Sequence, residues 1–268
     1  MPMTITLRIS VYLGLILGGY KMKNILYGST ARRRVFEVDA VTFDGTNDYM
    51  RRGGELTGAA DGKVGLLSFW YKSNRDGTTD QDFIFNITGY FYCRKLAGDN
   101  KIWVIGTSAP GPQVLNINST AVLIASGWTH FMASWNLAAT TTHLYINGVD
   151  AKTQTTATDT DIDYVRAGPN WSIGDNLAGT NLIQGDVAEL IFALEYLDLS
   201  VAANRAKLYS GKPVDPGDDG SLVTGTAPIV YQSVRSGDAA TVFAINKGSG
   251  GNFTITGALA IAATSPSD

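Results

Sequence analysis

The sequence of 268 residues contains little of the material from which catalytic and metal sites are usually built. It has one cysteine, Cys93, and two histidines, His130 and His143. A single cysteine excludes an intrachain disulfide framework and any zinc site made of several cysteines. Two histidines leave few groups for acid–base chemistry at neutral pH. We therefore predict a protein that is not an enzyme.

Charged residues are also scarce, at 17% of the chain against about 25% in a typical domain. Glycine (30 residues) and threonine are abundant, and hydrophobic residues make up 44%. Such a composition favours strands and turns over helices. It excludes global disorder, because enough apolar surface is available to form a core. The chain is thus predicted to be all-β, with helix content well below the usual third.

The net charge of −3 is unevenly distributed, because residues 1–36 carry six basic residues and no acidic one. The apolar run 9–19 is shorter than the roughly 20 residues of a membrane span. It has the length of a signal-peptide core, which is the alternative interpretation. No aromatic residues interleave the arginine run, so nucleic acid is not a predicted partner. We predict an arm that anchors the chain in a homo-oligomer or to another protein through Val11, Leu13, Leu15, Leu17, Arg32, Arg33 and Arg34.

Beyond the arm, short apolar segments alternate with turn residues. Twelve segments are predicted to be strands: 38–43, 67–71, 82–92, 101–106, 121–124, 129–135, 143–146, 171–173, 187–194, 229–234, 241–246 and 253–263. Asn147-Gly148 is the strongest hairpin signal. Only residues 201–209 are expected to be helical, with Ser200 as N-cap. We divide the chain into the arm 1–36, a body 37–210, and a linker with a C-terminal β extension, 211–268, that packs on the body.

Several motifs of the body occur in a recognisable order. They are Val41-Thr42-Phe43-Asp44-Gly45, Leu67-Ser68-Phe69-Trp70-Tyr71, Gly127-Trp128-Thr129-His130-Phe131, Leu144-Tyr145-Ile146-Asn147-Gly148, Ser172-Ile173-Gly174 and Gly185-Asp186-Val187-Ala188-Glu189-Leu190. Together they resemble the laminin G-like, concanavalin A-like jelly-roll domains over about residues 40–210. The resemblance implies a sandwich of two antiparallel sheets, with the arm and the C-terminal β extension added to it.

The C-terminal segments Pro228-Ile229-Val230-Tyr231, 246–254 and 264–268 resemble laminin G-like proteins encoded by bacteriophages and prophages. This resemblance implies a non-enzymatic structural or adhesive protein of a virion, as capsid decoration, fibre or appendage. The arm would then contact other virion proteins or further copies of the chain. The alternative is a carbohydrate-binding lectin module of a secreted or bacterial-surface protein. A glycan-cleaving enzyme is a weaker alternative.

Acidic residues offer one metal hypothesis. Asp159, Asp161 and Asp163 alternate in one loop, and Asp175 follows the Ser-Ile-Gly motif. Carboxylate oxygens suit calcium, and the laminin G resemblance implies a calcium site at the rim. Asp161, Asp163 and Asp175 are therefore the candidate ligands, although a solvated loop has the same composition. No other cofactor is predicted.

Residues for glycan chemistry are few. Glycoside hydrolysis needs a pair of positioned carboxylates, and the three-acid strand pattern of hydrolases with this fold is missing. Glu37 with Asp39 and Glu189 with Glu195 are interpreted as structural or solvated acids. No Gly-x-Ser-x-Gly nucleophile elbow occurs, and Cys93 is expected to be a small core residue. The five tryptophans (Trp70, Trp103, Trp128, Trp135 and Trp171) could stack on sugar, but at least three are expected in the core.

Overall fold

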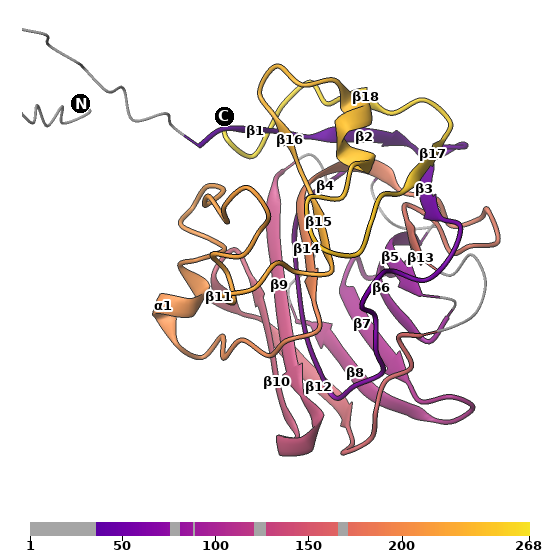
Figure 1. The fold of residues 1–268 in the computed structure, drawn as a ribbon, viewed down its shortest axis with the longest axis vertical. Helices are drawn as coiled ribbons and strands as arrows, with labels where there is room; N and C mark the ends of the chain where they lie inside the picture. The colour runs from indigo at the N-terminus through magenta and orange to yellow at the C-terminus, as the bar shows by residue number, and fades with distance from the viewer. Residues whose placement is uncertain (1–35, 76–80, 88, 121–126, 166–170) are drawn as a thin grey trace, which may run out of the picture. The chain divides into compact units, whose positions relative to one another are not determined.

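The computed structural model describes residues 36–75, 81–87, 89–120, 127–165 and 171–268. Over these residues the chain forms two antiparallel sheets packed face to face, and 6% is helical (Figure 1). The predicted all-β sandwich is therefore confirmed. No helix in the described part combines the length and apolar character needed to cross a membrane.

The first sheet is built around the longest strands, β4, β9 and β14. In spatial order its strands are β11 (Val149–Asp150), β10 (Thr141–Ile146), β9 (Thr129–Asn136), β4 (Val64–Ser73), β14 (Gln184–Ala193), β2 (Val41–Asp44) and β18 (Ala260–Ile261), with β15 (Val230–Gln232) also paired to β14. Asn147 and Gly148 turn between β10 and β11 with φ of 50° and 76°. These left-handed values are those of a tight hairpin, so the predicted hairpin is confirmed.

The second sheet also has eight strands. Their order is β12 (Lys152–Ala157), β8 (Gln113–Ser119), β7 (Ile102–Thr107), β6 (Phe91–Lys95), β5 (Asp82–Ile87), β13 (Trp171–Ile173), β3 (Tyr49–Arg52) and β17 (Thr254–Thr256). A separate pair joins β1 (Val38–Asp39) to β16 (Val234–Arg235). Strands β15, β17 and β18 all follow residue 210, so the C-terminal extension supplies strands to both sheets.

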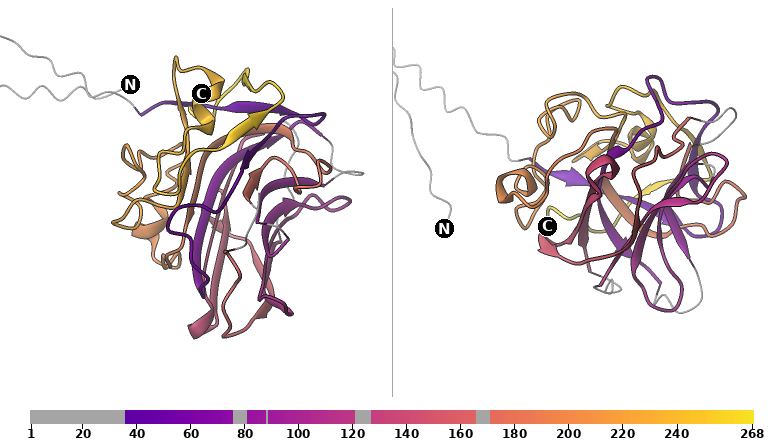
Figure 2. Two further views of the ribbon diagram at one scale, coloured as in Figure 1. Left: turned by 45° about the vertical axis from the view of Figure 1, so that its right-hand side comes forward. Right: turned by 90° about the horizontal axis from the view of Figure 1, so that it is seen from below.

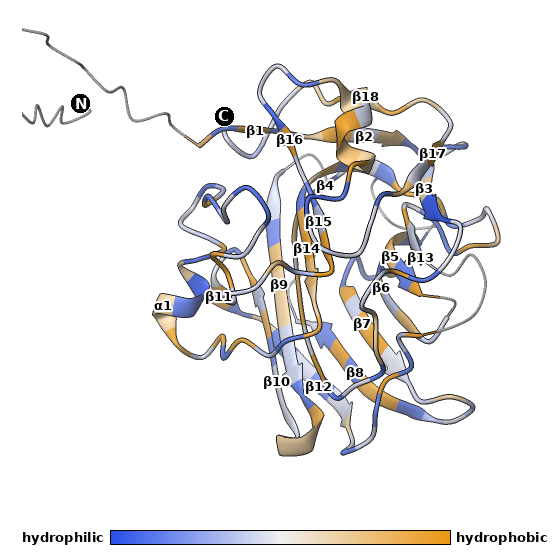
Figure 3. Cartoon of the chain, viewed as in Figure 1, coloured by the Kyte–Doolittle hydropathy of each residue, from blue (hydrophilic) through white to orange (hydrophobic). Residues whose placement is uncertain are grey.

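Aromatic rings from both sheets meet in the core. Phe192 of β14 lies 5.0 Å from Phe85 of β5 and 5.2 Å from Phe91 of β6, measured between ring centroids. Trp135 of β9 lies 5.2 Å from Phe91. Tilted and edge-on pairs of this kind add about 0.5–1.5 kcal/mol each beyond the burial of their surface. Figure 3 shows apolar residues recurring along the central strands, while many hydrophilic ones lie in the loops.

Period-2 alternation explains how β9 contributes to this core. Phe131, Ala133 and Trp135 all point between the sheets, whereas Met132 packs on the opposite face. Gly65 lies opposite Trp135 in β4. A Cβ at position 65 would overlap the indole ring of Trp135. The glycine is therefore required to admit the largest side chain of the core.

The outer face of the first sheet is covered by residues 194–228, here called the covering segment, which contains α1 (Ala202–Arg205). In Figure 2 this orange segment lies on the outer side of the first sheet. Its apolar residues pack on those of the sheet in one buried cluster, formed by Leu66, Met132, Tyr145, Ile191, Ala193, Leu197, Leu199, Leu208, Val223 and Tyr231. Both faces of the first sheet are thus largely buried, although polar residues such as Ser68 and Ser134 also lie on the outer one.

Several local predictions were wrong. The predicted strand 253–263 is two strands, β17 and β18, which join different sheets, and the predicted strand 229–234 is divided into β15 and β16. Residues 241–246 were expected to be a strand, but the 3₁₀ helix η2 (Ala240–Ala244) lies there, because its buried residues Ala240, Phe243 and Ala244 recur at helical spacing. Val201 is the N-cap of α1 in place of Ser200, whose hydroxyl donates to Asp198 instead. The predicted strand 82–92 is two strands joined by a turn, and strand 121–124 lies outside the described residues. A short 3₁₀ turn, η1 (Leu137–Ala139), follows β9.

Candidate functional site

The outer face of the second sheet differs from that of the first, because polar and aromatic side chains lie on it. Strand β8 shows the pattern: Leu115 and Ile117 are buried, while Asn116 and Asn118 alternate with them and are half-exposed. The register then aligns residues of neighbouring strands on the same face. We call the following group the open face: Phe83, Asn86, Tyr92, Arg94, Trp103, Asn116 and Asn118. Phe83 and Asn86 are buried, at 8% and 1% exposed, and the other five are partly exposed.

Two rows run across this open face. In the first, Phe83 pairs with Arg94, Arg94 with Trp103, and Trp103 with Asn118. In the second, Asn86 pairs with Tyr92, and Ile105 separates Tyr92 from Asn116. Directly paired residues have Cβ atoms about 4.5–5.5 Å apart. The rings and amides are therefore neighbours on one surface although they come from four strands.

Arg94 lies between two of the aromatic rings. Its guanidinium carbon is 5.2 Å from the centroid of Tyr92 and 5.5 Å from that of Phe83. The two rings are 5.5 Å apart. Arg94 Nη1 donates to Gln81 Oε1 at 2.7 Å. These contacts hold the guanidinium plane over the rings, where cation–π attraction favours it.

Trp103 and Asn116 have polar atoms with unused hydrogen-bonding capacity. Neither the indole N–H of Trp103 nor the Oδ1 of Asn116 has a partner among the described residues. Asn116 Nδ2 donates to Gln113 Oε1 at 3.1 Å. An amide carries both donors and acceptors, and an indole adds an apolar ring to a single donor. Both unpartnered atoms are buried, so a ligand on this face would meet the partly exposed remainder of the two side chains, an apolar ring beside an amide.

The second row continues onto the far strands of the sheet. Asn86 pairs with Ser172 of β13, and Ser172 pairs with Arg51 of β3. Arg51 lies over the ring of Tyr49, 4.3 Å from its centroid, and forms an ion pair with buried Asp175. The hydrogen bond from Arg51 to Asp175 raises the pKa of Arg51. Asp175 therefore neutralises this arginine.

That pairing changes the interpretation of the predicted calcium ligands. Asp175 is fully buried against Arg51, Asp163 is 3% exposed, and Asp161 is exposed. The backbone N–H of Asp163 donates to the carbonyl of Thr107 at 3.0 Å. Within the described ranges, no three or more Asp, Glu, His or Cys residues form a group able to hold a metal ion. The structure thus does not assemble the predicted set.

The predicted arm residues lie outside the described residues. Val11, Leu13, Leu15, Leu17, Arg32, Arg33 and Arg34 all fall in the range 1–35. The predicted anchoring role of the arm therefore stays a prediction.

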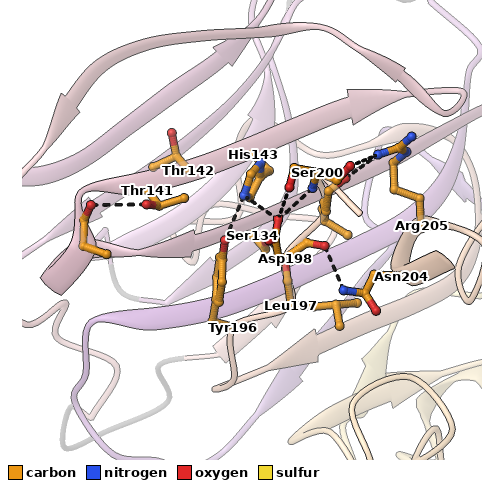
Figure 4. Close-up of polar contacts among 12 residues, drawn as sticks. Ser134, Thr141, Thr142, His143, Tyr196, Leu197, Asp198, Ser200, Asn204 and Arg205 are labelled. Carbon is orange, nitrogen blue, oxygen red and sulfur yellow. Dashed lines mark hydrogen bonds and ion pairs between the residues drawn. The ribbon is translucent and has the colours of Figure 1, made fainter. Parts of the chain in front are cut away.

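His143 belongs to a polar cluster under the covering segment (Figure 4). Its Nε2 lies 2.9 Å from the hydroxyl of Tyr196 and 3.4 Å from Oδ1 of Asp198. Ser200 donates to the same Asp198 oxygen at 2.6 Å. The carboxylate lies between serine and histidine, whereas a nucleophilic triad needs the histidine between them. Partial burial lowers the pKa of His143.

His130 is enclosed in the fold. Its side chain is 1% exposed. Its Nε2 lies 3.0 Å from Ser68 Oγ, and the ring stacks on Tyr209 at 5.2 Å. Burial lowers the pKa of His130 to about 3, so it is neutral at physiological pH. Cys93 is likewise buried as expected, and burial raises the pKa of its thiol.

Glu189 is used to attach the C-terminal segment. It accepts hydrogen bonds from the Tyr231 hydroxyl at 3.0 Å and from Arg235 Nη1 at 3.2 Å. Burial raises the pKa of Glu189, and its φ of 48° coincides with the register shift in β14. Glu195 accepts from the hydroxyl of Thr226 instead. The two acids therefore have separate structural partners.

Three of the five tryptophans are buried, as expected: Trp70, Trp135 and Trp171 are 4%, 0% and 0% exposed. Trp103 and Trp128 are half-exposed. The remaining open-face residues were missed as a group at the sequence level. The signal was present, because Tyr92 and Arg94 alternate with Phe91 and Cys93, and the two asparagines alternate with Leu115 and Ile117.

Comparison with known proteins agrees with this architecture. Residues 44–192 match the family described as the Concanavalin A-like lectin/glucanases superfamily. The match covers more than half of the chain, which therefore belongs to this superfamily. No curated protein sequence matches the chain.

Solved structures show the same fold. A protein from Bacteroides ovatus, described as carbohydrate-binding, aligns with a TM-score of 0.57 at 15% identity, over 85% of this chain and 60% of its own. A heptameric SAP-like pentraxin from Limulus polyphemus aligns with a TM-score of 0.53 at 12% identity, over 84% of this chain and 94% of its own. The chain thus spans somewhat over half the length of the Bacteroides protein. At these identities the likeness is one of fold.

Proposed function

We propose that the chain is a non-catalytic carbohydrate-binding module that holds a glycan on the open face. The observation that carries the proposal is the partly exposed row of Arg94, Trp103 and Asn118 beside Tyr92 and Asn116, over which no described segment forms a buried cluster like that on the first sheet. Aromatic rings offer flat apolar surface to the C–H face of a sugar, while amides exchange hydrogen bonds with its hydroxyls. Membership of a lectin and glucanase superfamily supports the same class of ligand.

Binding is favoured over cleavage by the composition of the face. Glycoside hydrolysis requires two carboxyl groups flanking the scissile bond. The open-face residues include no acid, and the nearby Asp175 is paired with Arg51. A turnover assay on polysaccharides that the chain binds would overturn this part if it released reducing ends.

The sequence also predicts where such a module would act. The resemblance of residues 228–268 to phage-encoded proteins favours display on a virion, with an extracellular or bacterial-surface protein as the alternative. The comparisons support carbohydrate binding and carry no information on a virion. Antibody labelling of purified particles tests this location, and particles without the chain would contradict it.

A glycan array probed with the full chain, followed by calorimetry, tests the binding function. Trp103→Ala should weaken binding roughly tenfold or more, equivalent to about 1.4 kcal/mol, because it removes the central ring. Trp128→Ala is the matched control: Trp128 is also half-exposed but lies beside the first sheet, where its Nε1 donates to Thr264. Absence of any glycan ligand, or equal losses in both variants, would refute the proposal.

A further inference from the structure

Two arginines project from the outer face of the second sheet, and their surroundings differ. Arg51 is neutralised by buried Asp175. Arg94 forms no ion pair with any described residue, and its one hydrogen bond goes to the neutral side chain of Gln81. The neighbours of Arg94 in the register, Phe83 and Trp103, are uncharged. Among the described residues, the open face therefore carries one positive charge that no carboxylate neutralises.

The geometry of Arg94 suits an incoming anion. A guanidinium has five N–H donors in a rigid fork, and only one of its terminal nitrogens is engaged, at 2.7 Å from Gln81. Stacking on Tyr92 and Phe83 fixes the plane of the fork before a ligand arrives. Bidentate pairing with a carboxylate or sulfate is stronger and more directional than a neutral hydrogen bond. Because the fork is preorganised, little side-chain entropy is lost on binding.

An aromatic ring beside Arg94 completes the site. Arg94 and Trp103 are directly paired across β6 and β7, so their Cβ atoms are about 5 Å apart. One saccharide unit can therefore reach both side chains. We propose that Arg94 makes the open face selective for anionic saccharides, in which the ring stacks on Trp103 and the carboxylate or sulfate pairs with Arg94. This inference rests on the proposed function.

The experiment uses the full chain and matched pairs of ligands. One pair is an oligogalacturonate and its carboxyl-reduced form, and the other is an O-sulfated galactan and its desulfated form. Within each pair the members differ only at the anionic group, which is reduced to an alcohol in the first pair and removed in the second, so the two pairs distinguish a carboxylate from a sulfate. The wild type should bind the anionic member of at least one pair roughly tenfold more tightly. This preference should shrink as salt is raised, since the ion pair is partly exposed.

Variants assign the preference to Arg94. Arg94→Gln should abolish the preference, so that the anionic form binds no more tightly than the neutral form, and Arg94→Lys should retain part of it, because the charge remains but the fork is lost. Lys101→Gln is the control, since it removes a partly exposed positive charge near β7 whose partner is Asp99. Circular dichroism establishes that each variant is folded.

Failure of this inference is distinguishable from failure of the proposed function. Equal binding of charged and neutral forms by the wild type would overturn the role of Arg94 and leave carbohydrate binding intact. Persistence of the preference in Arg94→Gln would do the same. Absence of binding to both forms of both pairs, together with an empty glycan array, would overturn both.

Discussion

The outer faces of the two sheets differ in how deeply their side chains are buried. On the first sheet, Met132 and Ile191 are covered by Leu199 and its neighbours, so the sheet is buried on both sides. On the second sheet, Trp103 and Asn118 are partly exposed to solvent. The covering segment makes the first sheet a support and leaves the second available as a binding surface. In the proposed function, the first sheet therefore contributes to stability and the second to recognition.

The largest effect should come from the core that the two sheets share. Trp135→Ala should lower the free energy of unfolding by about 3–5 kcal/mol, because it leaves a large cavity between the sheets. It also removes the hydrogen bond from the indole to the Tyr164 hydroxyl, 3.0 Å long. Urea denaturation measures the loss. A change below about 1 kcal/mol would place the ring outside the cooperative core.

The covering segment should matter next. Leu199→Ala should cost about 2–3 kcal/mol, at the lower end for buried leucines, because a surface segment can settle into the space left. Leu222 lies in the same segment but is 64% exposed, whereas Leu199 is 0% exposed. Leu222→Ala is therefore the matched control and should be almost neutral. Similar losses in both variants would contradict a packed cover.

His130 gives the first sheet a dependence on pH that the open face lacks. Its pKa is lowered to about 3 in the folded protein, against about 6.5 in an unfolded chain. Between these values the unfolded state binds one more proton, so stability falls as the pH falls below about 6.5. The contribution is about 1.4 kcal/mol per pH unit.

Chemical denaturation between pH 6 and pH 4 isolates this contribution. His130→Gln keeps a hydrogen-bonding partner for Ser68 but cannot titrate, so its stability should fall less steeply than that of the wild type. Parallel slopes in the two proteins would show that His130 takes up its proton equally in both states.

The smallest effect on stability should come from the open face. Trp103→Ala should change the free energy of unfolding by about 1 kcal/mol or less, because the ring is half-exposed and no described segment packs over it as one does on the first sheet. The same variant is expected to lose glycan binding. A loss comparable to that of Trp135→Ala would mean that Trp103 supports the fold and would weaken its assignment as a binding residue.

Local signals in the sequence were sufficient for much of the fold. Asn147-Gly148 specifies its hairpin through two neighbouring residues, and Phe131, Ala133 and Trp135 specify a buried face by alternation. The strand predicted at residues 241–246 was wrong. Threonine, valine and phenylalanine favour strands, but the burial of Phe243 at helical spacing favours the 3₁₀ helix that forms there.

The open face could not be predicted in the same way, because the exposure of its side chains depends on segments far away in the sequence. Trp70 and Trp103 both lie in predicted strands. The ring of Tyr209, whose centroid is 5.6 Å from that of Trp70, helps to bury Trp70. Nothing near Trp103 in the sequence indicates that its face stays uncovered. Asp175 shows the same limit, since its partner Arg51 is 124 positions away.

The segment from Thr254 to Ile261 closes the sandwich at one side. Strand β17 pairs with β3 of the second sheet, and β18 pairs with β2 of the first. Between them the backbone N–H of Ala258 donates to buried Asp48 at 2.7 Å. An unpaired strand edge is a template for aggregation. This one stretch therefore protects two edges at once, and its release would expose β2 and β3 together to other chains.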